Sequence, residues 1–198
     1  KAYILRQKSS VQDQFLEDPS AAMDSVVQAI QLTLGDEEYL TQLEELVRRH
    51  DAHDRLLEVY RYIYQIAPSV REKRRWLSRC AQVLASPLNR PRESLQTLLE
   101  AFSLMPEEGE WLDEILRLSA QIDQWESAFQ AYTLLVSAGE SPQQKIDYHI
   151  KKARIAEQNL GQPAQAMDEY CRVLILNNEY DHALSELERL AVENGLWD

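Results

Sequence analysis

Glycine and proline are scarce in this sequence, which has five glycines and seven prolines in 198 residues. All twelve fall in short breaks between long segments rich in Leu, Ala, Glu, Gln and Arg, which are good helix formers. No run of alternating β-branched residues is present, and such runs are the usual sign of a strand. The scarcity of helix breakers therefore predicts an all-α protein.

Basic charge is also limited. The chain has 21 Lys and Arg residues against 33 Asp and Glu residues, so its formal net charge is −12. A nucleic-acid partner is not expected, because neutralising phosphates requires a basic surface. No apolar run approaches the ~20 residues of a membrane-spanning helix, so no membrane insertion is expected either.

Cysteine is nearly absent. Cys80 and Cys171 provide neither a disulfide framework nor a pair of metal ligands. A reducing compartment is compatible with this, and a cytoplasmic location is the working expectation. The sequence begins at Lys1 without a methionine, which leaves room for a targeting segment that has been removed.

Internal repetition is the strongest pattern in the sequence. Pro19, Pro91 and Pro163 are each 72 residues apart, and a shift of 72 also aligns apolar residues downstream of them. The aligned sets include Ala22, Ser94 and Ala166, then Met23, Leu95 and Met167, and then Ile30, Phe102 and Leu174. Self-similarity at a fixed period indicates a repeat array. We expect one repeat domain over residues 1–198, with units of about 1–72, 73–144 and 145–198.

Each 72-residue unit is predicted to contain four helices, which gives about eleven helices in the chain. The first four helices are expected at 1–16, 19–35, 37–50 and in a segment after Asp51. Four more are expected within 70–138 and three within 142–194. Proline suits the first position of a helix, and Ser69 and Ser141 begin capping-box patterns. Asp51 and Asp123 are predicted N-caps. Trp197-Asp198 matches Trp125-Glu126, so we expect the chain to be a piece of a longer array.

The spacing within a unit is that of two unequal helical hairpins. A small or apolar residue early in each second helix recurs at intervals of 34, 38, 34 and 38, at Ala22, Leu56, Ser94, Ala128 and Ala166. A bulky residue follows four positions later, at Val26, Tyr60, Leu98, Tyr132 and Tyr170. Pro68 and Pro106 each end a hairpin.

With these offsets the chain resembles the tetratricopeptide repeat family over essentially its whole length, and degenerate bacterial arrays are the most similar. The resemblance implies an α-solenoid of antiparallel helical hairpins that forms a superhelix. It also implies a concave groove, lined by the first helix of each hairpin, that holds a partner peptide or protein. The early tryptophan of the family pattern is mostly absent here. The glycine or alanine that the pattern has in the first helix is present only as Ser9, Ala81 and Ala153.

Two basic stretches interrupt the acidic composition. They contain Arg75 and Arg79 in the first, and Lys151, Lys152 and Arg154 in the second. One interpretation is that basic and acidic helices lie side by side and form exposed ion pairs, each contributing under about 1 kcal/mol. The other is that these five residues bind the carboxylates of a partner.

The sequence gives little indication of a catalytic, metal-binding or reactive-thiol site. His50 and His53 could face one ion, yet the aligned turn at Asp123 has no histidine, so a capped turn explains the pattern and no metal is predicted. Cys171 aligns with Leu99 and Val27, which predicts a core position. Cys80 aligns with Lys8 and Lys152, which predicts an exposed position in a basic setting. No catalytic motif and no cofactor-binding motif is present.

The leading hypothesis is a non-catalytic scaffold for protein–protein contacts, with no cofactor. The alternative is a recruitment or regulatory region of a larger enzyme or signalling protein, which the full-length reading frame would reveal. Apolar faces at the ends of the array could also drive self-association.

Overall fold

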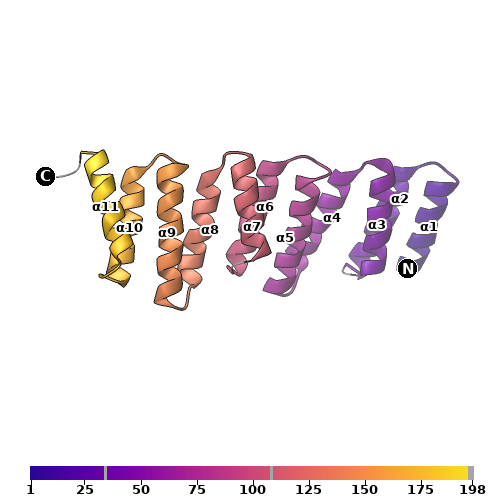
Figure 1. Cartoon of the computed structure of the whole chain (residues 1–198). Helices are drawn as coiled ribbons and strands as arrows, with labels where there is room; N and C mark the ends of the chain where they lie inside the picture. The colour runs from indigo at the N-terminus through magenta and orange to yellow at the C-terminus, as the bar shows by residue number, and fades with distance from the viewer. Residues whose placement is uncertain (34, 108, 196–198) are drawn as a thin grey trace. The chain divides into compact units, whose positions relative to one another are not determined.

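The computed structural model describes residues 1–33, 35–107 and 109–195. These residues form eleven α-helices and contain no strand. The helices are α1 (Ala2–Gln14), α2 (Pro19–Thr33), α3 (Glu37–His50), α4 (His53–Ile66), α5 (Val70–Ala85), α6 (Pro91–Leu104), α7 (Glu110–Gln121), α8 (Trp125–Ala138), α9 (Pro142–Gln158), α10 (Pro163–Leu176) and α11 (Asp181–Glu193). Within residues 1–97 and within residues 98–195, helices that follow one another run side by side in opposite directions (Figure 1). The predicted array of about eleven helices in antiparallel hairpins is confirmed for the described residues.

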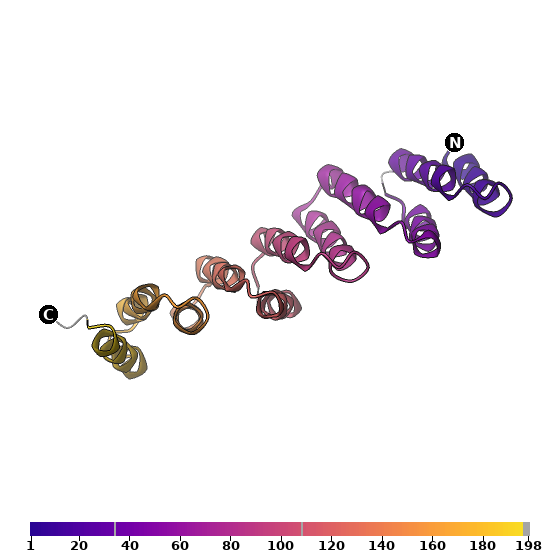
Figure 2. The same ribbon diagram turned by 90° about the horizontal axis from the view of Figure 1, so that it is seen from above.

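The chain divides into two compact units, Lys1–Thr97 and Leu98–Asp198. Within each unit the helices lie in two rows when viewed from above (Figure 2). The odd-numbered helices are the first helices of the hairpins, and the even-numbered ones are the second. The single domain and its boundaries near residues 72 and 144 stay a prediction. The predicted helix start at Trp197-Asp198 lies outside the described residues.

Each unit has its own apolar core. In the first unit the core joins residues of α2, α3, α4 and α5, and Ala22, Ile30, Leu40 and Leu43 in it are completely buried. In the second unit it joins α9, α10 and α11, around Ala166 and Tyr170. The small residues at the predicted close-packing positions are all buried, with exposed fractions of 0–1% for Ala22, Ser94, Ala128 and Ala166. A small side chain there allows neighbouring helices to approach closely, which holds each hairpin against the next.

Helix starts follow local sequence. Proline occupies the first position of α2, α6, α9 and α10. Ser141 and Gln144 form a complete capping box at the start of α9, and the Ser69 hydroxyl accepts a hydrogen bond from the backbone N–H of Glu72 at the start of α5. Both caps were predicted. They fix where α5 and α9 begin, and these two helices carry the predicted binding residues.

The predicted N-caps at Asp51 and Asp123 are wrong. Both residues have left-handed backbone conformations, with φ of 53° and 52°, and they follow the ends of α3 and α7 instead of capping the next helix. Ala52 and Gln124 stand at the N-cap positions of α4 and α8, without side-chain caps. Helices commonly end at a left-handed residue, and a short polar side chain such as that of Asp tolerates this conformation.

Left-handed residues mark every hairpin turn with the predicted spacing. They occur at Glu17, Asp51, Asn89, Asp123, Gly161 and Gly195. The intervals between them alternate between 34 and 38 residues. Every second left-handed position is therefore separated by 72 residues. The period read from apolar side chains is therefore also present in the backbone.

Candidate partner-binding surface

The first unit contains a cavity of about 400 Å³ among residues of α3, α4 and α5. Its lining is Glu44, Val47, Arg48, His53, Leu56, Tyr60, Arg79, Gln82, Val83 and Pro87. The Tyr60 hydroxyl donates a hydrogen bond of 2.5 Å to Oε1 of Glu44. Burial and this carboxylate raise the pKa of Tyr60, so the phenol stays protonated. The lining of the cavity thus combines apolar side chains with two arginines and one carboxylate, that of Glu44.

Arg79 is the central cation of this first cavity. Its guanidinium carbon lies 4.8 Å from the ring centroid of Trp76 and 5.8 Å from that of Tyr60. The two rings pack on each other with centroids 5.6 Å apart. Arg79 Nη2 is also 3.2 Å from a carboxylate oxygen of Glu37, and Arg75 Nη2 is 2.5 Å from the other oxygen. Arg75 and Arg79 both contact Glu37 of α3, whose carboxylate lies between them.

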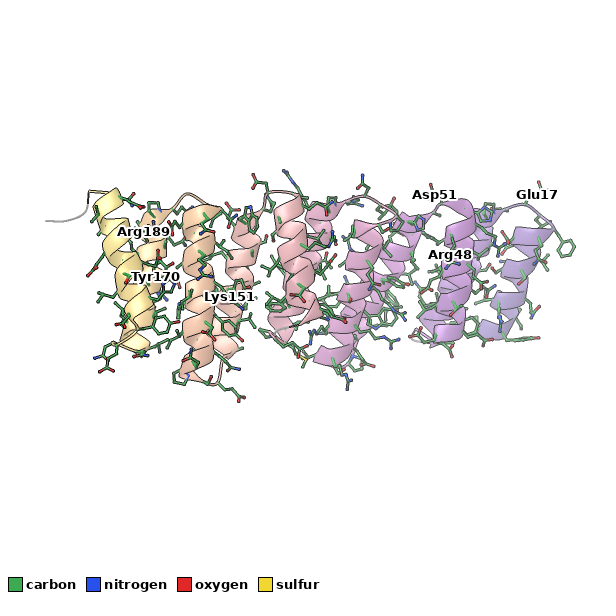
Figure 3. All side chains as sticks on the ribbon, viewed as in Figure 1. Glu17, Arg48, Asp51, Lys151, Tyr170 and Arg189 are labelled. Carbon is green, nitrogen blue, oxygen red and sulfur yellow. The ribbon has the colours of Figure 1, made fainter. Side chains whose placement is uncertain are left out.

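The second unit contains a similar cavity of about 400 Å³ among residues of α9, the turn before α11 and α11 itself. It is lined by Gln144, Asp147, Tyr148, Ile150, Lys151, Arg154, Tyr180 and His182. Lys151 and Arg154, both predicted from sequence, are exposed and share this lining. Figure 3 shows Lys151 on α9 and Arg189 on α11. The ammonium nitrogen of Lys151 lies 5.4 Å from the centroid of Tyr132 and 5.9 Å from that of Tyr148.

Lys152, the remaining predicted binding residue, is only 3% exposed and lines neither cavity. Its ammonium nitrogen is 2.9 Å from Oε1 of Glu169 and 4.6 Å from the ring centroid of Phe129. Nδ1 of His149 is 2.6 Å from the other carboxylate oxygen. We refer to His149, Lys152 and Glu169 as the buried triad. Lys152 belongs to this internal cluster between α9 and α10.

Sequence reasoning missed the buried triad because its members occupy core positions. A shift of 72 places Leu77 and Leu5 at the position of His149, and Thr97 and Ser25 at that of Glu169. The available signal was a histidine where the other copies have leucine, and a glutamate where they have threonine or serine. Burial raises the pKa of Glu169, and hydrogen bonds from His149 and Lys152 lower it by more, so the pKa lies below its ordinary value. Arg172, at 4.0 Å, is the other cation near this carboxylate.

Both predictions about the cysteines are wrong. Cys80 is 1% exposed and lies in the core of the first unit, whereas Cys171 is exposed on α10. The prediction for Cys80 assumed that the aligned lysines mark an exposed position, yet Lys152 is buried because Glu169 neutralises it. The prediction for Cys171 used Leu99 and Val27, of which Leu99 is buried and Val27 is half-buried. The aligned position is therefore not uniformly part of the core.

The histidines near Asp51 form two separate pairs. His50 Nε2 is 2.8 Å from Asp13 of α1, and His53 Nε2 is 3.3 Å from Asp51. Arg49 also pairs with Asp13 and helps to lower the pKa of that carboxyl group, against the effect of its partial burial. Among the residues described, no group of three or more His, Cys, Asp or Glu side chains is arranged to hold a metal ion.

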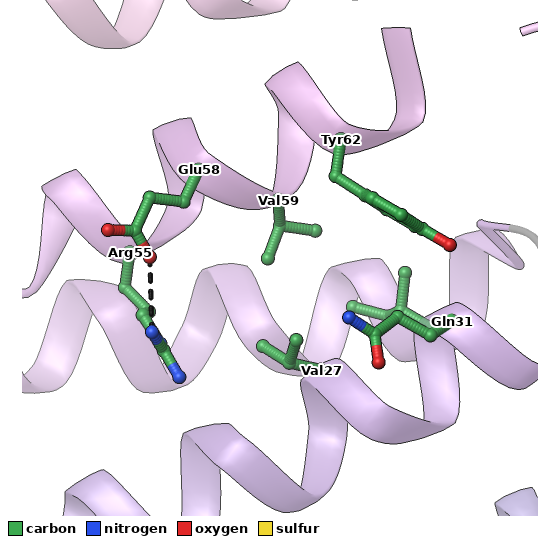
Figure 4. A pocket seen from close by; sticks show the side chains of 7 residues that line it. Val27, Gln31, Arg55, Glu58, Val59 and Tyr62 are labelled. Atoms are coloured by element: carbon green, nitrogen blue, oxygen red, sulfur yellow. Dashed lines mark hydrogen bonds and ion pairs between the residues drawn. The ribbon is translucent and has the colours of Figure 1, made fainter. Parts of the chain in front are cut away.

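A smaller cavity of about 210 Å³ lies on the other side of the first unit, between the second helices α2 and α4. Val27 and Val59 lie on facing helices in it, with Gln31 and Tyr62 at one end (Figure 4). Arg55, at its other end, forms ion pairs with Glu58 and Asp24. The one cation on its lining, Arg55, is thus paired with two carboxylates.

Exposed ion pairs join helices that are two apart in the chain. Arg6 of α1 pairs with Glu38 of α3, and Arg189 of α11 pairs with Glu157 of α9 at 2.7 Å. The Glu37 pairs with α5 follow the same pattern. Ion pairs therefore join α1 to α3, α3 to α5 and α9 to α11, as one of the two interpretations of the charge pattern expected. Within the described ranges no helix is long and apolar enough to cross a lipid bilayer.

No protein-family model matches this chain, and no curated protein is significantly similar to it. Among solved structures, it is similar to a tetratricopeptide repeat protein from Bacteroides fragilis, with 10% identity, coverage of 98% of this chain and 99% of that one, and a TM-score of 0.47. A tetratricopeptide repeat protein from Parabacteroides merdae has 17% identity, coverage of 98% and 73%, and a TM-score of 0.42. A thermophilic protein of this kind from Thermus thermophilus has 14% identity, coverage of 97% and 100%, and a TM-score of 0.36. Likeness at this level says nothing about what the chain binds.

Proposed function

We propose that this chain is a non-catalytic scaffold that binds an acidic segment of a partner protein on its first-helix side. The observation that supports this most directly is the cavity of the second unit. Two residues predicted from the sequence to bind a partner, Lys151 and Arg154, lie in the lining of the same cavity. Tyr148, Tyr180 and His182 add aromatic surface to that lining. Aromatic side chains and cations together suit a peptide that carries carboxylates beside apolar residues.

Charge distribution supports an acidic partner. The protein as a whole has a net charge of −12, so a partner with carboxylates is repelled from most of its surface. The lining of the second cavity, by contrast, contains two cationic side chains, Lys151 and Arg154, and one carboxylate, that of Asp147. This carboxylate accepts a hydrogen bond from Gln143 at 3.3 Å. A locally cationic lining on an acidic protein directs an acidic ligand to that place.

The same cations could instead serve only the stability of the array, as the Arg75 and Arg79 pairs with Glu37 suggest. Exposed pairs of this kind contribute about 0–1 kcal/mol. Their removal therefore changes stability little, and a strong effect on binding would identify them as ligand-binding groups.

The test is a variant in which Arg75, Arg79 and Lys151 are all replaced by Glu, measured against an array of immobilised acidic, neutral and basic peptides. We expect the intact chain to retain acidic peptides and the variant to bind them at least about tenfold more weakly, with little change in melting temperature. A matched control replaces Arg55, Arg61 and Arg172, on second helices, by Glu and changes the net charge equally. Unchanged binding by the first variant together with lower stability would support the purely structural interpretation.

A further inference from the structure

We propose that the cavity among α3, α4 and α5 binds a phosphorylated side chain of the partner protein, held between Arg48 and Arg79. This inference rests on the proposed function and deepens it, because it names the chemical group that the first unit binds. It concerns this cavity alone and makes no use of the second unit.

Cationic side chains from three helices line this cavity. Arg48 is in the last turn of α3, His53 is the first residue of α4, and Arg79 is within α5. Figure 3 labels Arg48 on α3. The lining contains one carboxylate, that of Glu44, and its Oε1 already accepts a hydrogen bond from Tyr60. The two guanidinium groups therefore outnumber the carboxylate.

The N–H donors of Arg48 are not used by the protein. This side chain is exposed, and it forms no hydrogen bond or ion pair with residues 1–33, 35–107 or 109–195. The adjacent Arg49, by contrast, pairs with Asp13. The guanidinium of Arg48 is therefore available to an anion in the cavity.

Arg79 is held in place by aromatic rings. Its guanidinium carbon lies 4.8 Å from the ring centroid of Trp76 and 5.8 Å from that of Tyr60, and both rings are buried. The side chain of Arg79 is nevertheless 25% exposed. A long cationic side chain that already rests on fixed rings loses less conformational freedom when an anion binds it.

The contacts of Arg79 favour a phosphate over a carboxylate as the ligand. Nη2 of Arg79 is 3.2 Å from Oε2 of Glu37, so a carboxylate of the protein already lies beside this guanidinium. A single carboxylate of a partner would only replace one such contact with another. A phosphate monoester carries a charge of about −1.5 to −2 at pH 7 and three acceptor oxygens, so it has acceptors for Arg79 and Arg48 together.

The rest of the lining suits the carbon atoms next to a phosphate. Val47, Leu56, Val83 and Pro87 contribute apolar side chains to this cavity, whose volume is about 400 Å³. Gln82 adds an amide group, which is able to donate a hydrogen bond to a phosphate oxygen. The ligand described by this lining is a phosphorylated residue with apolar neighbours.

The cationic lining is not a requirement of the repeat. A shift of 72 places Ala120 at the position of Arg48 and Trp125 at that of His53. The hairpin of α7 and α8 forms without either cation. Arg48 and His53 are therefore particular to the first unit, and neither is needed to close a hairpin of this type.

The experiment is a fluorescence-anisotropy titration of the full chain with three versions of one labelled synthetic peptide. The central residue, between two valines, is phosphoserine, glutamate or serine. We expect the phosphoserine version to bind at least about tenfold more tightly than the glutamate version, because it adds charge and an acceptor oxygen. Arg48→Gln and Arg79→Gln should each remove most of this preference.

The matched control is Arg61→Gln, which removes an exposed arginine of α4 that pairs with Glu93 at 3.9 Å and lies outside this lining. It should leave the preference unchanged. Because Arg48 has no partner within the described residues, Arg48→Gln should also leave the melting temperature unchanged. Loss of the preference in that variant would then not come from unfolding. Inorganic phosphate, added as a competitor, distinguishes a phosphorylated peptide from the free anion.

The outcomes separate this inference from the proposed function. Equal binding of the phosphoserine and glutamate versions would overturn the phosphate assignment and leave a scaffold for acidic segments in place. A preference that persists in both Arg48→Gln and Arg79→Gln would overturn the assignment to this cavity. Displacement of the peptide by an equal concentration of inorganic phosphate would overturn the assignment to a phosphorylated partner. No binding of the phosphoserine version or of any acidic peptide would overturn both this inference and the proposed function.

Discussion

At the scale of single residues, the two cysteines have opposite environments. Cys80 is in the core of the first unit and Cys171 is exposed on α10. Thiol reagents react with the accessible thiol and not with one inside a packed core. We expect Ellman's reagent to modify one thiol per chain in native protein and two in denaturant. Cys171→Ser should abolish the native reaction, and Cys80→Ser should leave it unchanged. Rapid modification of two thiols in native protein would contradict the structure.

The buried triad makes a second prediction at this scale. Glu169 has a pKa below its ordinary value in the folded protein, so its charge stabilises the fold above the unfolded-state pKa of about 4.3 and this contribution is lost as the pH falls through the folded pKa. We expect Glu169→Gln to lower the free energy of unfolding by about 3–5 kcal/mol at pH 7, because the buried ammonium group of Lys152 loses its carboxylate and the ring of His149 loses a hydrogen-bond partner. The difference in free energy of unfolding between this variant and the original protein should become smaller below about pH 4.

Denaturant unfolding at several pH values measures this effect. Glu114→Gln is the matched control, because Glu114 pairs with Arg117 at an exposed site and should cost under about 1 kcal/mol. Replacing His149, Lys152 and Glu169 together by leucine or methionine should be far less harmful than Glu169→Gln alone, since no unpaired charge stays buried. A loss of equal size at pH 3 and pH 7 would show that the charge of Glu169 does not matter.

At the scale of helices and turns, the left-handed residues determine where each hairpin closes. Five of the six are Asn, Asp or Gly, which tolerate positive φ, and Glu17 is the exception. We expect Glu17→Gly to raise the free energy of unfolding by about 1 kcal/mol and Gly161→Ala, at the corresponding turn, to lower it by a similar amount. No atom lies within 4 Å of where the alanine Cβ would be placed, so the second effect isolates the backbone conformation. Chemical denaturation checks both, and effects of the same sign would contradict this account.

The sequence predicted most of the helices because their ends carry local signals. Proline at the start of four helices, and the caps at Ser69 and Ser141, act through the backbone of their own first turn. The turn residues Asp51 and Asp123 were misassigned because Asp favours both an N-cap and a left-handed position. Only the path of the backbone distinguishes these roles.

The candidate sites were less predictable than the helices. Arg79, Lys151 and Arg154 were found as charge patterns, and the structure places each of them on the lining of a cavity. The aromatic partners Trp76 and Tyr148 were not found, because a buried ring at helical spacing is also an ordinary core residue. Lys152 was grouped with the exposed cations because its partner, Glu169, is seventeen residues away on another helix. Pairing across helices is a tertiary property that a linear pattern does not contain.

At the scale of the whole molecule, the chain is an array in which the same backbone turns and the same cation–aromatic arrangement occur in both compact units. Such arrays are stabilised mainly by neighbouring hairpins, which leaves many side chains on the first helices available for a partner.

The central claim is that acidic peptides bind on the first-helix side of each unit. The most direct measurement is a two-dimensional NMR titration of the isotopically labelled full chain with a synthetic peptide of alternating glutamate and leucine. The account predicts that shifted resonances fall on residues lining the two larger cavities, including Arg79, Gln82, Lys151 and Arg154. Shifts confined to the second-helix cavity of Val27, Val59 and Tyr62, or no shifts over the whole titration, would contradict it.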